Sequence, residues 1–180
     1  MRLYTQQPKL VWEQVQQTDE FVMTADHPDS FLVKADNNDA RKAYHWMTQA
    51  LADRVNRPEI AQTPVWWWLT EPNEHPHVNH QWDNSQDDVI IEADIDYFDC
   101  LFTDFQMWSV ALLGMYIHPV KSETTQQWAK TEDWLDSLPD TVKQQRIIES
   151  WQFMIGIHPN TRTQAVTWTI PRDAVISVHQ

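Results

Sequence analysis

Glycine is almost absent from this chain, and its scarcity rules out several common nucleotide-binding folds. Of 180 residues only two are glycine, Gly114 and Gly156. A dinucleotide-binding fingerprint needs three glycines, and a P-loop needs two at a fixed distance before a lysine, because glycine lets the backbone approach the phosphates closely. The usual glycine-rich phosphate cradles are therefore absent.

The remaining composition is that of a folded domain. Hydrophobic residues make up 42% and charged residues 22%, and eleven residues are Trp, which is atypical of a disordered chain. The single cysteine, Cys100, excludes an intrachain disulfide and a cysteine-based zinc site. The longest apolar run, Val110–Ile117, is far shorter than the roughly 18 residues of a membrane span, and the first residues lack a signal-peptide pattern. We expect one domain over residues 1–180, soluble and cytoplasmic, without membrane contact.

Acidic residues dominate the charge. The net charge is −13, and the stretch from Pro58 to Val120 contains eleven acids but neither Lys nor Arg. Such a field repels phosphate backbones and attracts basic surfaces, so we expect no direct binding to a nucleic-acid backbone. A basic protein partner fits this charge. The alternative is that the charge only keeps a Trp-rich chain soluble.

Strand and helix patterns alternate along the chain. The clearest strand is Val89–Tyr97, where apolar residues at odd positions alternate with acids at 92, 94 and 96. Asn38 or Asp39 suits the cap of one helix, and Thr103 or Asp104 the cap of another. The patterns predict an α+β fold with small mixed or antiparallel sheets and packed helices. The predicted strands are 2–6, 65–69, 89–97, 163–170 and 175–178, and the predicted helices follow Pro8 or cover about 39–55, 104–117, 128–135 and 141–155.

Three histidines lie within six residues at His75, His77 and His80, close to Glu71 and Glu74. Imidazole and carboxylate are good ligands for zinc or nickel. The segment contains prolines and has the composition of a solvated loop, so it has no preset ligand geometry. We expect no metal, and these histidines are the candidate ligands if one binds.

A second acidic pattern places Glu92, Asp94 and Asp96 on one strand face. Alternate residues lie roughly 6.6–6.8 Å apart, which suits a divalent cation or paired acid–base chemistry. The alternative is an ordinary solvent-facing strand. Cys100 lies in an apolar and acidic context that raises a thiol pKa, so it is not expected to act as a nucleophile.

Three consecutive tryptophans, Trp66 to Trp68, must send side chains to both faces of their strand. One face therefore presents indole either to a second core layer or to an aromatic-lined pocket. Indole stacks well on nucleobase, nicotinamide or sugar rings.

Several segments, taken in order, resemble the bacterial family known as domain of unknown function 3841. The resemblance spans nearly the whole chain and implies a small intracellular bacterial or phage protein, with no activity assigned. The segments are Met1–Pro8 with Val11-Trp12, Thr63–Trp68, Val89–Glu92 leading to Leu101–Trp108, Ser150-Trp151, and Gln164–Ile170.

A weaker resemblance is to ADP-ribosyltransferases of the DarT type, carried by the element order, by Phe102-Thr103-Asp104 and by Gln164-Ala165. It implies an NAD cleft between two small sheets and a catalytic Glu directly after the Gln-Ala pair. Here that position is Val166, and Thr169 stands where the unknown-function family tends to have Glu. Since a valine cannot stabilise the charge that develops at the ribose, whether the chain is an enzyme stays open.

These observations lead to two hypotheses. The first is a cleft for a nucleotide or NAD-like ligand, in which Arg2 meets phosphate, a Trp stacks on a ring and Gln164 hydrogen-bonds ribose or amide. A catalytic carboxylate would then come from Glu92 or Asp94. The second hypothesis is a non-enzymatic acidic protein that inhibits a basic partner by imitating the charge of DNA. The residues expected to line the cleft are Arg2, Tyr4, Gln6, Trp66, Trp68, Asp104 and Gln164.

Overall fold

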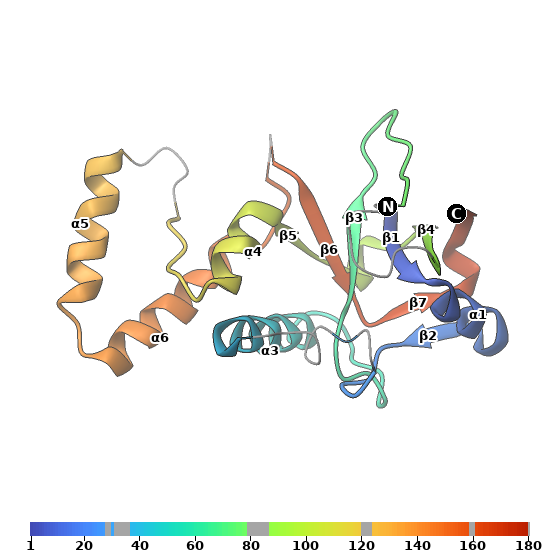
Figure 1. Ribbon diagram of the computed structural model, residues 1–180, viewed down its shortest axis with the longest axis horizontal. Helices are drawn as coiled ribbons and strands as arrows, with labels where there is room; N and C mark the ends of the chain where they lie inside the picture. The colour runs from blue at the N-terminus through green and yellow to red at the C-terminus, as the bar shows by residue number, and fades with distance from the viewer. Residues whose placement is uncertain (28–29, 31–36, 79–86, 120–123, 159–160, 180) are drawn as a thin grey trace.

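The computed structural model describes residues 1–27, 30, 37–78, 87–119, 124–158 and 161–179 (Figure 1). These residues form an α+β fold around a six-stranded sheet whose strands follow the order β5-β6-β3-β1-β4-β8, with antiparallel neighbours throughout. The α+β prediction is thereby confirmed. The strands of this sheet are β1 (Arg2–Pro8), β3 (Val65–Leu69), β4 (Asp88–Asp94), β5 (Leu101–Asp104), β6 (Thr163–Thr167) and β8 (Val175–His179).

One face of the sheet packs against helix α1 (Lys9–Thr18). The helix contributes Val11 and Val15 to a core that also contains Leu3 of β1 and Trp67 of β3, all fully buried. Trp67 Nε1 donates a hydrogen bond of 2.8 Å to Thr167 Oγ1, so its one polar atom is satisfied within the sheet.

Among the described residues, helices cover the opposite face at one end. Helices α3 (Asn38–Ala52) and α4 (Phe105–Leu112) pack over it and bury Trp66, whose ring lies 4.6 Å from that of Trp108. The strip formed by Tyr4, Trp68 and Ile90 instead packs under the segment that ends at Val78. The part of this face away from α3 and α4 therefore has a different cover, the segment that ends at Val78.

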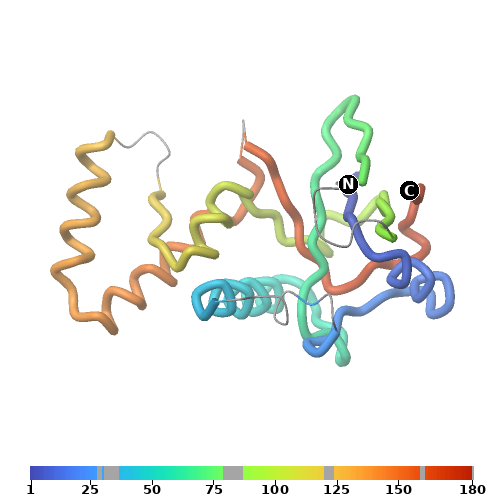
Figure 2. The backbone as a smooth tube through the Cα atoms, in the orientation of Figure 1, coloured from blue at the N-terminus to red at the C-terminus, as the bar shows by residue number. Residues whose placement is uncertain are grey.

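Two further units flank the sheet. Strands β2 (Glu20–Val22) and β7 (Thr169–Pro171) form a separate two-stranded sheet. Helices α5 (Thr125–Asp136) and α6 (Asp140–Ser150) project away from the sheet at the side of α4 (Figures 1 and 2). Among the helices that the structure describes, none is long and apolar enough to cross a membrane.

Most predicted elements are present, with shifted boundaries. The cap of α3 is Asn37, which lies one residue before Asn38 and two before Asp39, the two predicted caps, and its Oδ1 accepts from Ala40 N. Asp104 caps α4, as predicted, and accepts from Met107 N. The helix ends at Leu112 instead of continuing toward residue 117.

Two strands are shorter than their patterns predicted. Strand β4 stops at Asp94, because the Asp96 side chain accepts from Phe98 N and begins a 3-10 turn that contains Tyr97. The predicted strand 163–170 is divided at Trp168 into β6 and β7, which belong to different sheets. All five residues of β6 are buried, so both faces of this strand are covered.

Helix α6 ends at Ser150 and not at the predicted residue 155, and a 3-10 helix over Trp151–Met154 follows. The buried positions of α6 are Ile147 and Ser150. Ser150 Oγ accepts from Ile117 N at 2.8 Å, a tertiary contact that local periodicity cannot predict.

Candidate functional site

One row of side chains crosses all six strands on the partly uncovered face of the sheet. Directly opposed residues on neighbouring strands point to the same face, with Cβ atoms about 4.5–5.5 Å apart. We refer to this set as the cross-sheet row, and it brings together three residues of the predicted cleft. In strand order it consists of Thr103, Gln164, Trp68, Tyr4, Glu92 and Ser177.

Tyr4 lies at the centre of the cross-sheet row and is only 7% exposed. Its hydroxyl donates to Glu74 Oε1 at 3.0 Å and accepts from Arg162 Nη2 at 2.8 Å. Burial raises the pKa of Tyr4; the Arg162 guanidinium lowers it and the Glu74 carboxylate adds to the rise. The phenol therefore stays protonated and serves both as a donor and as an acceptor.

Arg162 lies over the neighbouring indole of Trp68. Its guanidinium carbon is 4.3 Å from the ring centroid of Trp68, within the range of a cation–π contact. The ring of Phe105 meets Trp68 edge-on at 5.0 Å, and Phe105 N donates to Arg162 O. We call the rings of Trp68 and Phe105 the aromatic corner. The Arg162 side chain lies over Trp68 in this corner and is 59% exposed.

Two buried polar atoms lie next to this corner. Gln164 is 7% exposed and Thr103 is fully buried. Gln164 Oε1 and Thr103 Oγ1 have no hydrogen-bond partner among the described residues. A buried polar atom without a partner costs about 1–3 kcal/mol, so such atoms in native proteins call for an explanation.

A cleft of about 650 Å³ opens on the other side of Tyr4. Its walls are Arg2 of β1, Glu92 of β4, the segment 70–76 and part of β8, and Glu74 joins it to the Tyr4 hydroxyl. A volume of this size falls within the 300–1,000 Å³ range of small-molecule sites.

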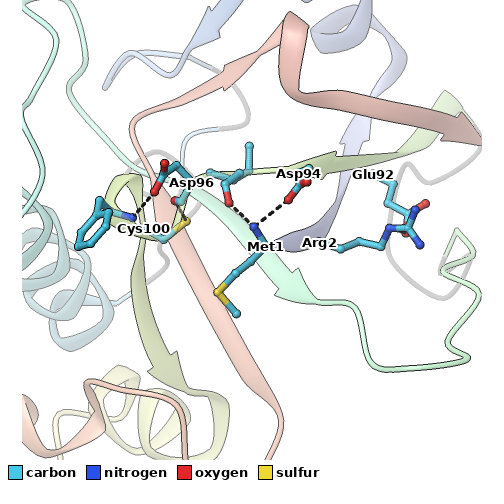
Figure 3. Close-up of polar contacts among 8 residues, drawn as sticks. Met1, Arg2, Glu92, Asp94, Asp96 and Cys100 are labelled. Atoms are coloured by element: carbon cyan, nitrogen blue, oxygen red, sulfur yellow. Dashed lines mark hydrogen bonds and ion pairs between the residues drawn. The ribbon is translucent and has the colours of Figure 1, made fainter.

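Polar contacts organise the floor of the cleft around Glu92, which is largely buried. Arg2 Nε lies 3.4 Å from Glu92 Oε1, and Figure 3 shows these two side chains meeting beside β1. Ser177 Oγ donates to Glu92 Oε2 at 3.0 Å, and His179 Nε2 lies 2.8 Å from Ser177 Oγ. Both oxygens of Glu92 are thus engaged.

The three carboxylates predicted to share one strand face have separate roles. The N-terminal ammonium of Met1 donates to Asp94 Oδ1 at 2.8 Å and to Ile95 O (Figure 3). This hydrogen bond lowers the pKa of Asp94. Asp96 lies beyond the strand and accepts from Phe98 N, so these carboxylates do not converge with Glu92 on a common point.

The remaining predicted residues lie elsewhere. Trp66 is in the core under α3 and α4, and Asp104 is fully buried as the cap of α4. Gln6 donates to Asp88 Oδ2 at 2.7 Å, further along β1. The structure therefore brings Tyr4, Trp68 and Gln164 together and places Arg2 in the adjoining cleft. The other three predicted residues lie outside this site.

The histidine segment is only partly described. His75 lines the cleft, His77 is exposed, and His80 lies outside the described residues. Within the described part of the chain, no group of three or more His, Cys, Asp or Glu side chains could hold a metal ion. Burial raises the pKa of the Cys100 thiol to about 12, with the carboxylates of Asp99 and Asp96 adding to the rise.

Glu74 and Arg162, which both contact the Tyr4 hydroxyl, are among the residues of the site that were not predicted. Arg162 is two positions before Gln164, so extending the strand alternation by one step would have placed both on the same face. Glu74 belongs to a segment without regular secondary structure, and no periodic signal marks it.

Together, the sheet and the site define an α+β chain with a polar cleft and an aromatic corner on one sheet face. The chain belongs to the family described as domain of unknown function (DUF3841), whose model matches residues 2–176. Comparison with curated proteins and with solved structures gives no match.

Proposed function

We propose that this protein binds a nucleotide or NAD-like ligand in the cleft beside the cross-sheet row. The observation that carries the proposal is the convergence of Arg2, Glu74 and Glu92 in one 650 Å³ cleft. Arg2 offers a forked cationic group suited to phosphate, and the two carboxylates accept hydrogen bonds from ribose hydroxyls or amino groups.

The charge of the cleft favours such a mixed ligand over a bare anion. One arginine faces three carboxylates, those of Glu71, Glu74 and Glu92, with His75 and His179 beside them. Inorganic phosphate would meet more negative than positive groups, and like charges in contact are unfavourable. A ligand that carries hydroxyl and amino groups next to its phosphate can bind the arginine through the phosphate and the carboxylates through the other groups.

The proposal leaves catalysis open. Val166, at the position of the expected carboxylate, is fully buried and pairs with Trp66 beneath the helices. Glu92 belongs to the cross-sheet row, and Glu74 contacts the row through the Tyr4 hydroxyl. If the ligand reacts, Glu74 and Glu92 are the carboxylates in reach of it. The compartment that we propose for this protein is the cytoplasm.

A thermal-shift and calorimetric titration with NAD, ADP-ribose, ATP and nicotinamide tests this proposal. A ligand that binds only the folded chain raises the melting temperature in a dose-dependent way. Arg2→Ala should weaken binding about tenfold, by the loss of one charge-assisted contact. Lys143→Ala, which breaks an exposed ion pair with Asp136 on the projecting helices, is the matched control and should bind as the wild type does. Absence of a shift with all four ligands would refute the proposal.

A second candidate function, docking onto a basic protein, is supported by a different part of the surface. Phe98 is 82% exposed and Tyr97 is 54% exposed, and both lie in the 3-10 turn between Asp96 and Asp99. Exposed aromatic side chains bordered by acids suit a partner with an apolar pocket surrounded by basic groups.

This second function predicts salt-sensitive binding to a basic enzyme that acts on nucleic acid. Phe98→Ala should abolish that binding, because one large anchor side chain often dominates an interface. Trp134→Ala, which removes an aromatic side chain that is 44% exposed on α5, should leave it unchanged. Binding that does not weaken with salt would contradict the electrostatic part of this idea.

A further inference from the structure

The contacts of the Arg162 side chain indicate what kind of group the aromatic corner can bind. A flat guanidinium lies 4.3 Å over the Trp68 ring, donates to the Tyr4 hydroxyl at 2.8 Å and lies 3.7 Å from Glu74 Oε1. An aromatic face, a neutral acceptor and a carboxylate together form a receptor for a planar cation.

We propose that the aromatic corner is a binding site for a guanidinium group presented by another molecule, and that Arg162 occupies it when no ligand is bound. This inference does not rest on the nucleotide proposal, since it concerns the face of Trp68 and not the cleft beside Arg2. The ligand class is an arginine side chain or a small alkylguanidine.

The resident side chain can leave at low cost. The Arg162 side chain is 59% exposed, and its ion pair with Glu74 is that of a surface group, which contributes little to stability. Its departure also breaks the hydrogen bond to the Tyr4 hydroxyl, which still has Glu74 as a partner. Its backbone is fixed separately, because Phe105 N donates to Arg162 O at 3.0 Å. Only the side chain has to swing outward, and β6 does not need to move.

The site also holds an acceptor that Arg162 does not use. Gln164 lies directly opposite Trp68 on the same face, and its Oε1 is buried without a hydrogen-bond partner among the described residues. A guanidinium has five N–H donors, so a ligand's guanidinium that donates to the Tyr4 hydroxyl has donors left for this oxygen. A ligand that paired the amide oxygen would remove the cost of leaving it buried without a partner.

Charge selects the ligand further. Glu74 repels carboxylates and phosphates at this position, and the excess of acids over residues 58–120 attracts cations from a distance. An ammonium group is a compact, strongly hydrated charge that cannot lie flat on the indole, so lysine fits the corner less well than arginine.

The test uses Arg162→Ala and titration with methylguanidinium, followed by Trp fluorescence and melting temperature. If the Arg162 side chain occupies the corner most of the time, methylguanidinium can bind only to the small fraction of molecules in which the corner is open. Removing the Arg162 side chain should then tighten the apparent affinity for methylguanidinium by the inverse of that fraction, about tenfold. Methylammonium at equal ionic strength should have little effect. Arg146→Ala removes a similarly exposed arginine (52%) that pairs with Glu149, and this control should bind as weakly as the wild type.

Two further arms keep the result interpretable. Tyr4→Phe in the Arg162→Ala background removes one acceptor without removing the ring, and should weaken methylguanidinium binding. A blocked arginine peptide and free arginine distinguish a protein source from a small-molecule source. Equal affinities of Arg162→Ala and wild type for methylguanidinium, or equal responses to methylammonium, would overturn the proposal, whatever the nucleotide titration shows.

Discussion

Replacing Trp67 or Trp68 by alanine should have very different effects on stability, although the two residues are adjacent. Trp67 is fully buried and donates to Thr167 Oγ1, whereas Trp68 is half-buried and covered on one side by Arg162. Truncating a fully buried Trp costs about 3–5 kcal/mol through lost burial and the cavity left behind. For Trp68 we expect about 1–2 kcal/mol, because much of its ring area faces solvent or a movable side chain.

Urea and thermal unfolding followed by far-UV circular dichroism measure this difference. For a chain of this length, 1 kcal/mol corresponds to about 2–4 °C in melting temperature, so Trp67→Ala should melt about 6–20 °C below the wild type. Thr167 Oγ1 still donates to Thr169 O, so the hydroxyl is not left without a partner in that variant. Equal losses for the two variants, or a larger loss for Trp68→Ala, would refute the assignment of the two faces.

Three further predictions concern backbone strain, pH dependence and thiol reactivity. Gly114 has φ +67° and an added Cβ would lie 2.8 Å from Asp39 Cγ, so Gly114→Ala should cost at least about 1 kcal/mol in urea unfolding; an unchanged midpoint would contradict this. The ammonium of Met1 lowers the pKa of Asp94, so this contact stabilises the fold above the ordinary carboxyl pKa and the stabilisation is lost as pH falls. Asp94→Asn should therefore make the free energy of unfolding depend less on pH in the acid range. An unchanged pH dependence in that range would count against the contact. Burial raises the pKa of Cys100 to about 12, so iodoacetamide should label the folded chain at pH 8 far more slowly than the urea-unfolded chain, and equal rates would exclude a buried thiol.

The sequence patterns predicted the elements well wherever one face of an element is buried. Val65–Leu69 and the alternation that begins at Val89 were predicted as strands, and both lie in the central sheet. Asp104 was predicted as a possible helix cap and is one. These features depend on neighbours a few residues apart, which periodicity and capping preferences detect.

The site was only partly predictable, for a physical reason. Alternation placed Arg2, Tyr4 and Trp68 on strand faces, but strand order decides which of these faces meet, and β3 lies between β1 and β6 through contacts far apart in sequence. Trp66 and Trp68 share a face, yet α3 and α4 bury Trp66, whereas Trp68 stays half-buried beside Phe105 at the start of α4. Glu74 enters the site from the turn 71–74, where its backbone N donates to Glu71 O, and its contact with the Tyr4 hydroxyl joins residues 70 positions apart in sequence.

Hydrogen–deuterium exchange with and without a saturating concentration of ADP-ribose tests the central claim, that this sheet face binds a nucleotide-type ligand, most directly. The account predicts slower exchange in the segment 70–76 and in β8, which line the cleft, and unchanged exchange in α6, which projects away from it. Unchanged exchange throughout, or protection confined to α5 and α6, would contradict it.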